Sequence, residues 1–149
     1  MTGLQCPKAL WMSKNKKQLA APPDAKKLNV FRTGRRVGEL ARQLWPGGVE
    51  IEYRADDQPA MIDATREAID RADVIYEGSF AHQGVFVRAD ILLRDADGWN
   101  LYEVKASSKL KSHHLDDVAI QWYVISRHLP LNQAWVVHVD NGYTRQGEL

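Results

Sequence analysis

The chain has 149 residues, of which 44% are hydrophobic and 26% are charged, and its formal net charge is +1. The length and composition predict one soluble globular domain that buries a hydrophobic core. The net charge excludes a globally basic protein, so any affinity for nucleic acid must come from a local patch of basic residues. No apolar run approaches membrane-spanning length and no signal peptide is visible, so we expect no membrane partner. Cys6 is the only cysteine, which excludes a disulfide framework and favours a reducing cytoplasm.

The N-terminal segment is predicted to be a short helix followed by a polar loop. Pro7 suits the first helical position, and the helix would bury Leu10 and Trp11. Residues 13–27 are polar and lysine-rich and contain two consecutive prolines. We expect a solvated loop here rather than a patch that contacts phosphate.

Two helices are predicted between residues 33 and 72, with a short strand at Val49–Tyr53 between them. The first helix runs from Thr33 to Trp45. Its inward stripe is Val37, Leu40, Ala41 and Leu44. Glu39 falls opposite this stripe and is therefore expected to face solvent. The second helix covers Ala60–Ala72, with Met61, Ile62, Thr65, Ala68, Ile69 and Ala72 inward.

Antiparallel strands are predicted for the stretch from Val74 to Ala106. Runs of β-branched and aromatic residues are separated by turn signals at residues 81–84 and 95–98. If residues 95–98 form the second loop, Asp90 faces Glu103, and Lys105 lies on the same face. The opposite face is apolar and is expected to pack against a helix. It carries Val85, Val87, Ala89, Ile91, Leu93, Tyr102, Val104 and Ala106.

A third carboxylate is expected near this pair. With residues 81–84 as the first loop, Phe80 faces Val85 and Glu77 faces Arg88. Arg88 lies on the Asp90 face, so Glu77 should lie there as well.

The convergent carboxylates predict a metal site. Directly opposed carboxylates repel each other, and a divalent cation between them reverses that effect. Carboxylates, a backbone carbonyl and water suit Mg²⁺ or Mn²⁺. Lys105 would hold an attacking water or stabilise charge on a phosphate. The pattern D-x(n)-E-x-K is loose, and a solvated hairpin is the competing interpretation. The apolar opposite face favours a central hairpin and hence the metal site.

The C-terminal part predicts a polar loop, a helix and a last strand. The polar residues placed in the loop, where they would contact phosphate, are Lys109, Lys111, His113 and His114. Asp116 or Asp117 would cap a helix that ends near His128. Its buried stripe would be Leu115, Val118, Trp122, Ile125 and Leu129. Residues Ala134–Val139 form an apolar run, which predicts a strand buried on both faces.

The predicted order of elements is α-α-β-β-β-α-β, which indicates an α/β (α+β) fold. The helix before the last strand permits a parallel crossover, so we expect a central mixed sheet of about four or five strands flanked by helices. This order resembles the restriction-endonuclease-like core of the PD-(D/E)XK nuclease superfamily. Asp90 matches the aspartate on the second strand of that core, and Glu103-Val104-Lys105 matches its E-x-K motif on the third.

Within the superfamily, the chain most resembles RecB-type and Cas4-like nucleases. Gln121 matches the glutamine on the helix after E-x-K, although Tyr123 follows it at two residues rather than four. Members often carry a histidine or an acid on the first helix, for which Glu39 is the nearest candidate. The segment Gln5–Trp11 is similar to the CP-containing start of Cas4-like proteins. Cys6 has no partner cysteines, so no iron–sulfur cluster is predicted.

The resemblance implies a Mg²⁺- or Mn²⁺-dependent deoxyribonuclease, expected to be an exonuclease that acts on single-stranded or duplex DNA ends in repair, recombination or defence. The metal would be held by Asp90, Glu103, the Val104 carbonyl and Glu77; Lys105 and Gln121 would take part in catalysis; Lys109, Lys111 and Tyr123 would bind substrate. The alternative is a non-catalytic nucleic-acid-binding or assembly module. Residues 1–149 are expected to form a single domain. Because Tyr143–Leu149 carries no sequence signal that would end a domain, a chain that is the N-terminal part of a longer protein is the alternative.

Overall fold

The computed structural model describes residues 6–144 and 146–147. Gln5, at the start of the CP-containing segment, and residues 145 and 148–149, at the C-terminal end, lie outside the described residues. Contacts divide the chain into two compact units, one that ends at Thr33 and one that begins at Gly34.

The N-terminal unit contains helix α2 (Pro7–Asn15), the short 3-10 helix η1 (Lys17–Leu19) and the start of helix α3 (Ala25–Arg42). Pro7 lies in the first turn of α2, as predicted. The predicted burial of Leu10 and Trp11 is wrong, because both side chains are exposed. The predicted loop is wrong over much of its length, since α2, η1 and α3 together occupy most of residues 13–27.

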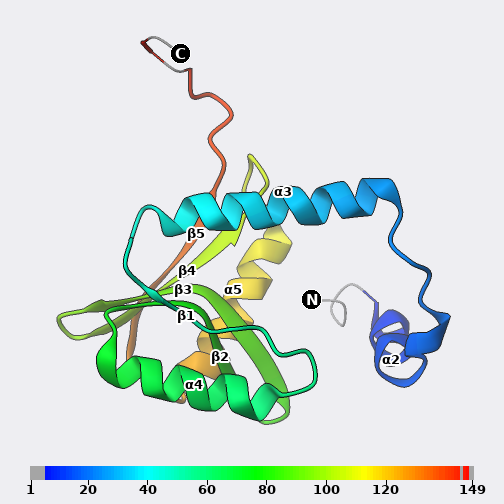
Figure 1. Cartoon of the computed structure of the whole chain (residues 1–149), viewed down its shortest axis with the longest axis horizontal. Coiled ribbons are helices and arrows are strands. Elements are labelled where there is room, and N and C mark those ends of the chain that lie inside the picture. Colours follow the sequence, from blue (N-terminus) through cyan, green and yellow to red (C-terminus); the bar gives the residue numbers. More distant parts are fainter. Residues whose placement is uncertain (1–5, 145, 148–149) are drawn as a thin grey trace. The chain divides into compact units, whose positions relative to one another are not determined.

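The second unit is a mixed sheet with helices on both faces (Figure 1). Among the described residues, its strands follow the spatial order β1 (Val49–Glu50), β2 (Val74–His82), β3 (Val85–Asp95), β4 (Gly98–Lys105) and β5 (Leu131–His138). Strands β2, β3 and β4 are antiparallel neighbours. Helix α4 (Gln58–Arg71) connects the parallel pair β1–β2, and helix α5 (Ser112–Ile125) connects the parallel pair β4–β5. The predicted mixed α/β sheet with flanking helices is therefore confirmed.

Two apolar clusters attach the helices to the sheet. Helices α4 and α5 pack on one face, over a core that includes Met61, Ala68, Ile75, Leu92, Leu101, Val124 and Ile125. The last turns of α3 pack on the other face, where Ala41 meets Tyr76 and Ile91. In Figure 1, α3 and α4 accordingly lie on opposite sides of the strands.

Helix α3 differs from its prediction at its start and along its inward face. It begins at Ala25 rather than at Thr33. Ala41 is buried, but Leu40 is 54% exposed and Leu44 is 62% exposed, so the predicted stripe is wrong at both leucines. The side of this helix that meets the cavity and the sheet carries Gly34, Gly38, Ala41 and Arg42 instead of the two leucines.

The helix and strand that follow β4 also differ from their predictions. Helix α5 begins at Ser112, so the predicted cap at Asp116 or Asp117 is wrong. His113 and His114 lie in the first turn of this helix instead of a loop. Leu115 is 54% exposed and does not belong to the buried stripe. The predicted burial of the last strand on both faces is wrong as well, because β5 is an edge strand and Trp135 is 50% exposed.

Gly98, at the start of β4, has no room for a side chain. A Cβ atom there would lie 2.5 Å from the Pro130 carbonyl oxygen, which also accepts a hydrogen bond from Trp99 N. We expect Gly98→Ala to lower the free energy of unfolding by about 1–3 kcal/mol, measured by urea denaturation, because the strand must shift.

Gly38→Ala is the matched control for that substitution. A Cβ at Gly38 meets nothing within 4 Å, and alanine is favoured over glycine inside a helix by about 1 kcal/mol. This variant should therefore be at least as stable as the parent protein. Equal stability of Gly98→Ala and the parent would contradict the close approach of residue 98 to Pro130.

Candidate active site

Glu77 and Asp90 lie opposite each other where the ladder between β2 and β3 is interrupted. The pairs on either side of them are Tyr76–Ile91 and Gly78–Ala89. Glu77 has a φ angle of 60°, a left-handed conformation that is uncommon outside glycine. Tyr76 contacts α3 through the small core, and Glu77 contacts it through Arg42, so two consecutive residues face the same helix. The register is the same on both sides of the interruption, so one residue of each strand is left out of the ladder.

The register of the first hairpin differs from its prediction by two residues. Phe80 pairs with Val87 rather than with Val85, and Arg88 pairs with Ser79 rather than with Glu77. The reason is a tighter loop at Gln83 and Gly84, where both residues have positive φ angles. Glu77 nevertheless reaches Arg88 along the diagonal, with 3.3 Å between Oε2 and Nη2. A shift of two residues keeps side chains on their faces, which is why Glu77 still lies beside Asp90.

The second hairpin has the predicted register only as far as the pair Ile91–Tyr102, where the ladder between β3 and β4 stops. Asp90 and Glu103, which were expected to be direct partners, are therefore not paired. Instead, Asp90 Oδ2 accepts a hydrogen bond of 2.7 Å from Val104 N. The two strands separate at this point, and the Asp90 carboxyl group fills the gap.

The surroundings of Asp90 disfavour a negative charge. Burial and the nearby charge of Glu103 raise the pKa of Asp90 to about 8, with a further contribution from Glu77. The Val104 N–H and the charge of Lys105 act in the opposite direction but do not cancel this rise. At neutral pH, the site therefore favours a proton or another cation on Asp90.

A polar network connects β4 to α5. Lys105 Nζ lies 2.7 Å from Glu103 Oε1 and 2.7 Å from Asp117 Oδ2. Gln121 Nε2 donates to Glu103 Oε2 at 2.6 Å, while Gln121 Oε1 is buried with no hydrogen-bond partner among the described residues. Burial opposes the charge of Lys105, but hydrogen bonds to both acids outweigh it and raise the pKa of the ammonium group. Lys105 is thus a fixed cation rather than a base.

The expectation that Asp90, Glu103 and Lys105 share one face is wrong for Asp90. Glu103 and Lys105 contact α5, whereas Asp90 lines the cavity on the α3 side. The interrupted ladders on both sides of Asp90 explain the difference, because strict alternation does not hold there. Asp90 nevertheless stays near Glu103 along the chain, because it accepts a hydrogen bond from Val104 N, the next residue after Glu103.

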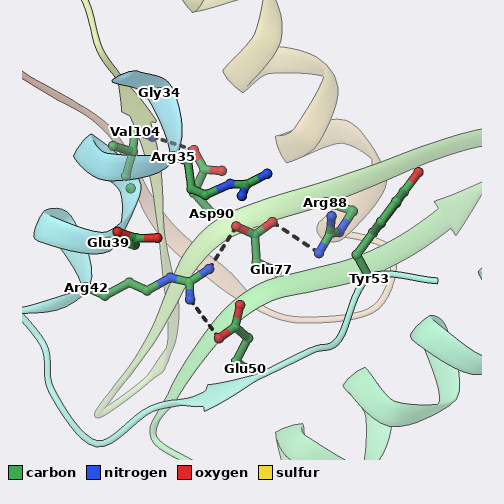
Figure 2. Close-up of a pocket in the computed structure, with 11 residues that line it drawn as sticks. Gly34, Arg35, Glu39, Arg42, Glu50, Tyr53, Glu77, Arg88, Asp90 and Val104 are labelled. Atoms are coloured by element: carbon green, nitrogen blue, oxygen red, sulfur yellow. Dashed lines mark hydrogen bonds and ion pairs between the residues drawn. The ribbon is translucent and has the colours of Figure 1, made fainter. Parts of the chain in front are cut away.

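A cavity of about 490 Å³ opens beside Asp90 (Figure 2). It is lined by Gly34, Arg35, Gly38, Glu39, Arg42, Glu50, Tyr53, Glu77, Arg88, Asp90 and Val104. Arg42 Nη2 lies 3.1 Å from Glu77 Oε1, and Arg42 Nη1 lies 2.8 Å from Glu50 Oε2. Burial opposes the charge of Arg42, but both glutamates outweigh it and raise the pKa of the guanidinium. The guanidinium of Arg88 lies 4.9 Å from the ring centroid of Tyr53.

The remaining predicted residues are distributed around these features. Glu39 is exposed but lines the cavity. Lys109 and Lys111 are exposed just before α5, and Lys111 is its N-cap residue. Tyr123 lies far along α5, where its hydroxyl donates to Gln83 Oε1 at 2.8 Å in the loop between β2 and β3. Tyr123 therefore does not contribute to the Glu103 network.

Sequence reasoning missed Asp117 and Arg42 as members of the site. Asp117 was interpreted as a helix cap, although its spacing of four from Gln121 places both on one helix face. Arg42 carried no comparable signal, because its role depends on Glu77, a partner distant in the sequence.

No three or more His, Cys, Asp or Glu residues of the described chain lie close enough together to hold a metal ion by themselves, and Cys6 is exposed. Nor does any helix within residues 6–144 have the length and apolar character needed to cross a membrane. No protein-family model, curated protein or solved structure matches the chain. Its chemistry must therefore be inferred from its own side chains.

Proposed function

We propose that the protein is a Mg²⁺- or Mn²⁺-dependent DNA nuclease of the PD-(D/E)XK type. The observation that carries the proposal is the hydrogen bond from Val104 N to Asp90, which holds the Asp90 carboxyl group against the backbone between Glu103 and Lys105, whose side chains are themselves paired at 2.7 Å. Two acids in a site that disfavours their joint ionisation, with a half-buried ammonium group paired to one of them, are the groups needed for metal-assisted hydrolysis of a phosphodiester.

The residues present fit a hard divalent cation. Asp90 and Glu103 would hold it through carboxylate oxygens and Val104 through its carbonyl oxygen, which is the donor chemistry that Mg²⁺ and Mn²⁺ prefer. Each Glu103 oxygen already accepts one hydrogen bond, but a second lone pair remains on each. A bound cation supplies a water of lowered pKa and offsets charge on the phosphate.

Lys105 and Gln121 would act through position and charge. Lys105 is held between Glu103 and Asp117 and stays protonated, so it would stabilise negative charge on the phosphate rather than accept a proton. Gln121 would orient Glu103 with its amide N–H and offer its unpartnered Oε1 to a water. Glu77 is less suited to bind metal, because both of its oxygens contact arginines.

Basic side chains near Asp90 support a substrate that carries phosphate groups. Arg35, Arg42 and Arg88 line the space next to Asp90, and exposed Lys109 and Lys111 precede α5. Arginine is well suited to bind phosphate oxygens. Attack at DNA ends rather than within strands stays a prediction from the resemblance.

The decisive experiment is incubation of the protein with end-labelled single-stranded and duplex DNA. We expect cleavage with Mg²⁺ or Mn²⁺ and none in EDTA. Glu103→Gln is the matched inactive control, because it keeps the shape of the side chain and removes its charge. DNA binding without cleavage under either metal would contradict the proposal and favour the non-catalytic nucleic-acid-binding module.

A further inference from the structure

We propose that Arg42 and Arg88 form a phosphate subsite, and that the Glu77 carboxylate occupies this subsite until substrate displaces it. In Figure 2, Glu77 lies between the two guanidinium groups. The inference rests on the proposed function and deepens it, since it names the contact that would bind a backbone phosphate next to Asp90.

The first support is the arrangement of charged atoms. Glu77 Oε1 lies 3.1 Å from Arg42 Nη2, and Glu77 Oε2 lies 3.3 Å from Arg88 Nη2. One carboxylate thus bridges arginines from two separate elements, α3 and β3. A phosphodiester also presents two anionic oxygens, and arginine binds both groups through the same N–H donors. Glu77 therefore holds the arginines in a geometry that a phosphate can use.

The second support is an unused donor. Arg88 Nε is buried and has no hydrogen-bond partner among the described residues. Besides its contact with Glu77, the Arg88 guanidinium donates a 3.4 Å hydrogen bond from Nη2 to the Ile51 carbonyl oxygen. A buried donor of a charged group without an acceptor is rare and calls for one. A phosphate has more acceptor oxygens than a carboxylate and can satisfy this donor as well.

The third support is the backbone of Glu77. Its φ angle of 60° belongs to the left-handed region, which residues other than glycine adopt at a cost. The two ion pairs help to hold the residue in that conformation. Release of the carboxylate into solvent is feasible, because 26% of the Glu77 side chain is already exposed. When a phosphate displaces Glu77, the contacts of the two arginines with the carboxylate are thus replaced by contacts with phosphate oxygens.

The test is calorimetric titration with thymidine 5′-monophosphate in EDTA, so that neither metal binding nor cleavage contributes. Glu77→Gln and Glu77→Gly should each raise the affinity about tenfold, because charge-assisted contacts become available to the ligand. Glycine adopts a positive φ freely, so Glu77→Gly also keeps the fold if glutamine is poorly tolerated. A thermal melt of each variant verifies that it is folded.

Glu67→Gln is the matched control. It removes one exposed carboxylate from α4, outside the cavity that Arg42 and Arg88 line. We expect less than a twofold change in affinity. Adding Arg88→Gln to Glu77→Gln should remove the gain. An equal gain from Glu67→Gln, no gain from either Glu77 variant, or a gain that persists without Arg88 would each overturn the subsite.

The outcome is separable from that of the nuclease assay. A protein that binds the nucleotide as expected but never cleaves DNA refutes the proposed nuclease and leaves the subsite standing. A protein that cleaves DNA but shows none of these affinity changes keeps its nuclease function and loses the subsite.

Discussion

Lys105→Gln should reduce DNA cleavage by about 100-fold or more while the protein keeps most of its Mn²⁺ affinity. The ammonium group lies 2.7 Å from both Glu103 and Asp117, so its position is fixed before substrate arrives. A protonated lysine cannot bind the metal, and its expected effect is on charge that develops in the transition state. Turnover should therefore fall more than substrate affinity. Glutamine is chosen because it can still donate hydrogen bonds to the two acids.

Calorimetric Mn²⁺ titration and the cleavage assay together separate this role from metal binding. Asp90→Ala should lose Mn²⁺ affinity and activity together. Lys26→Gln is the matched control, since it removes an exposed lysine that belongs to the N-terminal unit. Cleavage by Lys105→Gln at the parent rate would show that the E-x-K assignment is wrong, and the non-catalytic module would become the better interpretation.

Asp90→Asn should raise the free energy of unfolding above pH 8 when no divalent cation is present. The pKa of Asp90 is about 8 in the folded protein, against an ordinary value of 3.8. Between these values the folded state holds a proton that the unfolded state has released, so stability falls as the pH rises. The contribution of protonated Asp90 is complete below about pH 4 and is lost above about pH 8. One pKa unit corresponds to about 1.4 kcal/mol, so we expect a gain of about 2–4 kcal/mol after allowing for the coupling to Glu103.

Urea unfolding at pH 5, 7 and 8.5 in EDTA measures this effect. The parent protein should lose stability along the series more steeply than Asp90→Asn. Saturating Mn²⁺ should restore the parent at pH 8.5 and have a smaller effect on the variant, because ligand binding to the folded state adds to its stability. Asp116→Asn, at an exposed position of α5, is the control and should follow the parent. A parent protein whose stability is flat between pH 5 and 8.5 would contradict the raised pKa of Asp90.

The hairpins, the order of elements and the parallel crossover could be predicted from the sequence because they follow from local signals. The turn at residues 95–98 and the alternation beside it determine the β3–β4 register as far as Ile91. Helix α4 was predicted nearly to its ends, because its apolar spacing matches the residues that pack, such as Met61 and Ala68.

The failures at the candidate site share one physical cause. The apolar-stripe rule put Leu115 inside, yet the inward positions near the start of α5 hold His114, Asp117 and Gln121, which are buried or half-buried. Polar groups can occupy such positions when partners satisfy them, and the partners of Asp117 and Gln121 are on β4, outside any local window. The positive φ angle of Glu77 is likewise maintained by contacts with Arg42 and Arg88 and has no local sequence signal.

The hydrogen bond from Val104 N to Asp90 fastens β4 to β3 by a side chain where the backbone ladder has ended. This single side-chain hydrogen bond can open and close without disturbing the backbone pairing next to it. A ladder is opened only by breaking several backbone bonds together, whereas rotation of one carboxyl group removes this link between β3 and β4, while β4 keeps its ladder with β5. Lys105, on the α5 side of β4, contacts both Glu103 and Asp117, so its side chain cannot rotate as easily as the Asp90 carboxyl group. In the candidate site, the Asp90 side chain can therefore change its position while Lys105 stays fixed. We expect any conformational change during a reaction cycle to occur at Asp90.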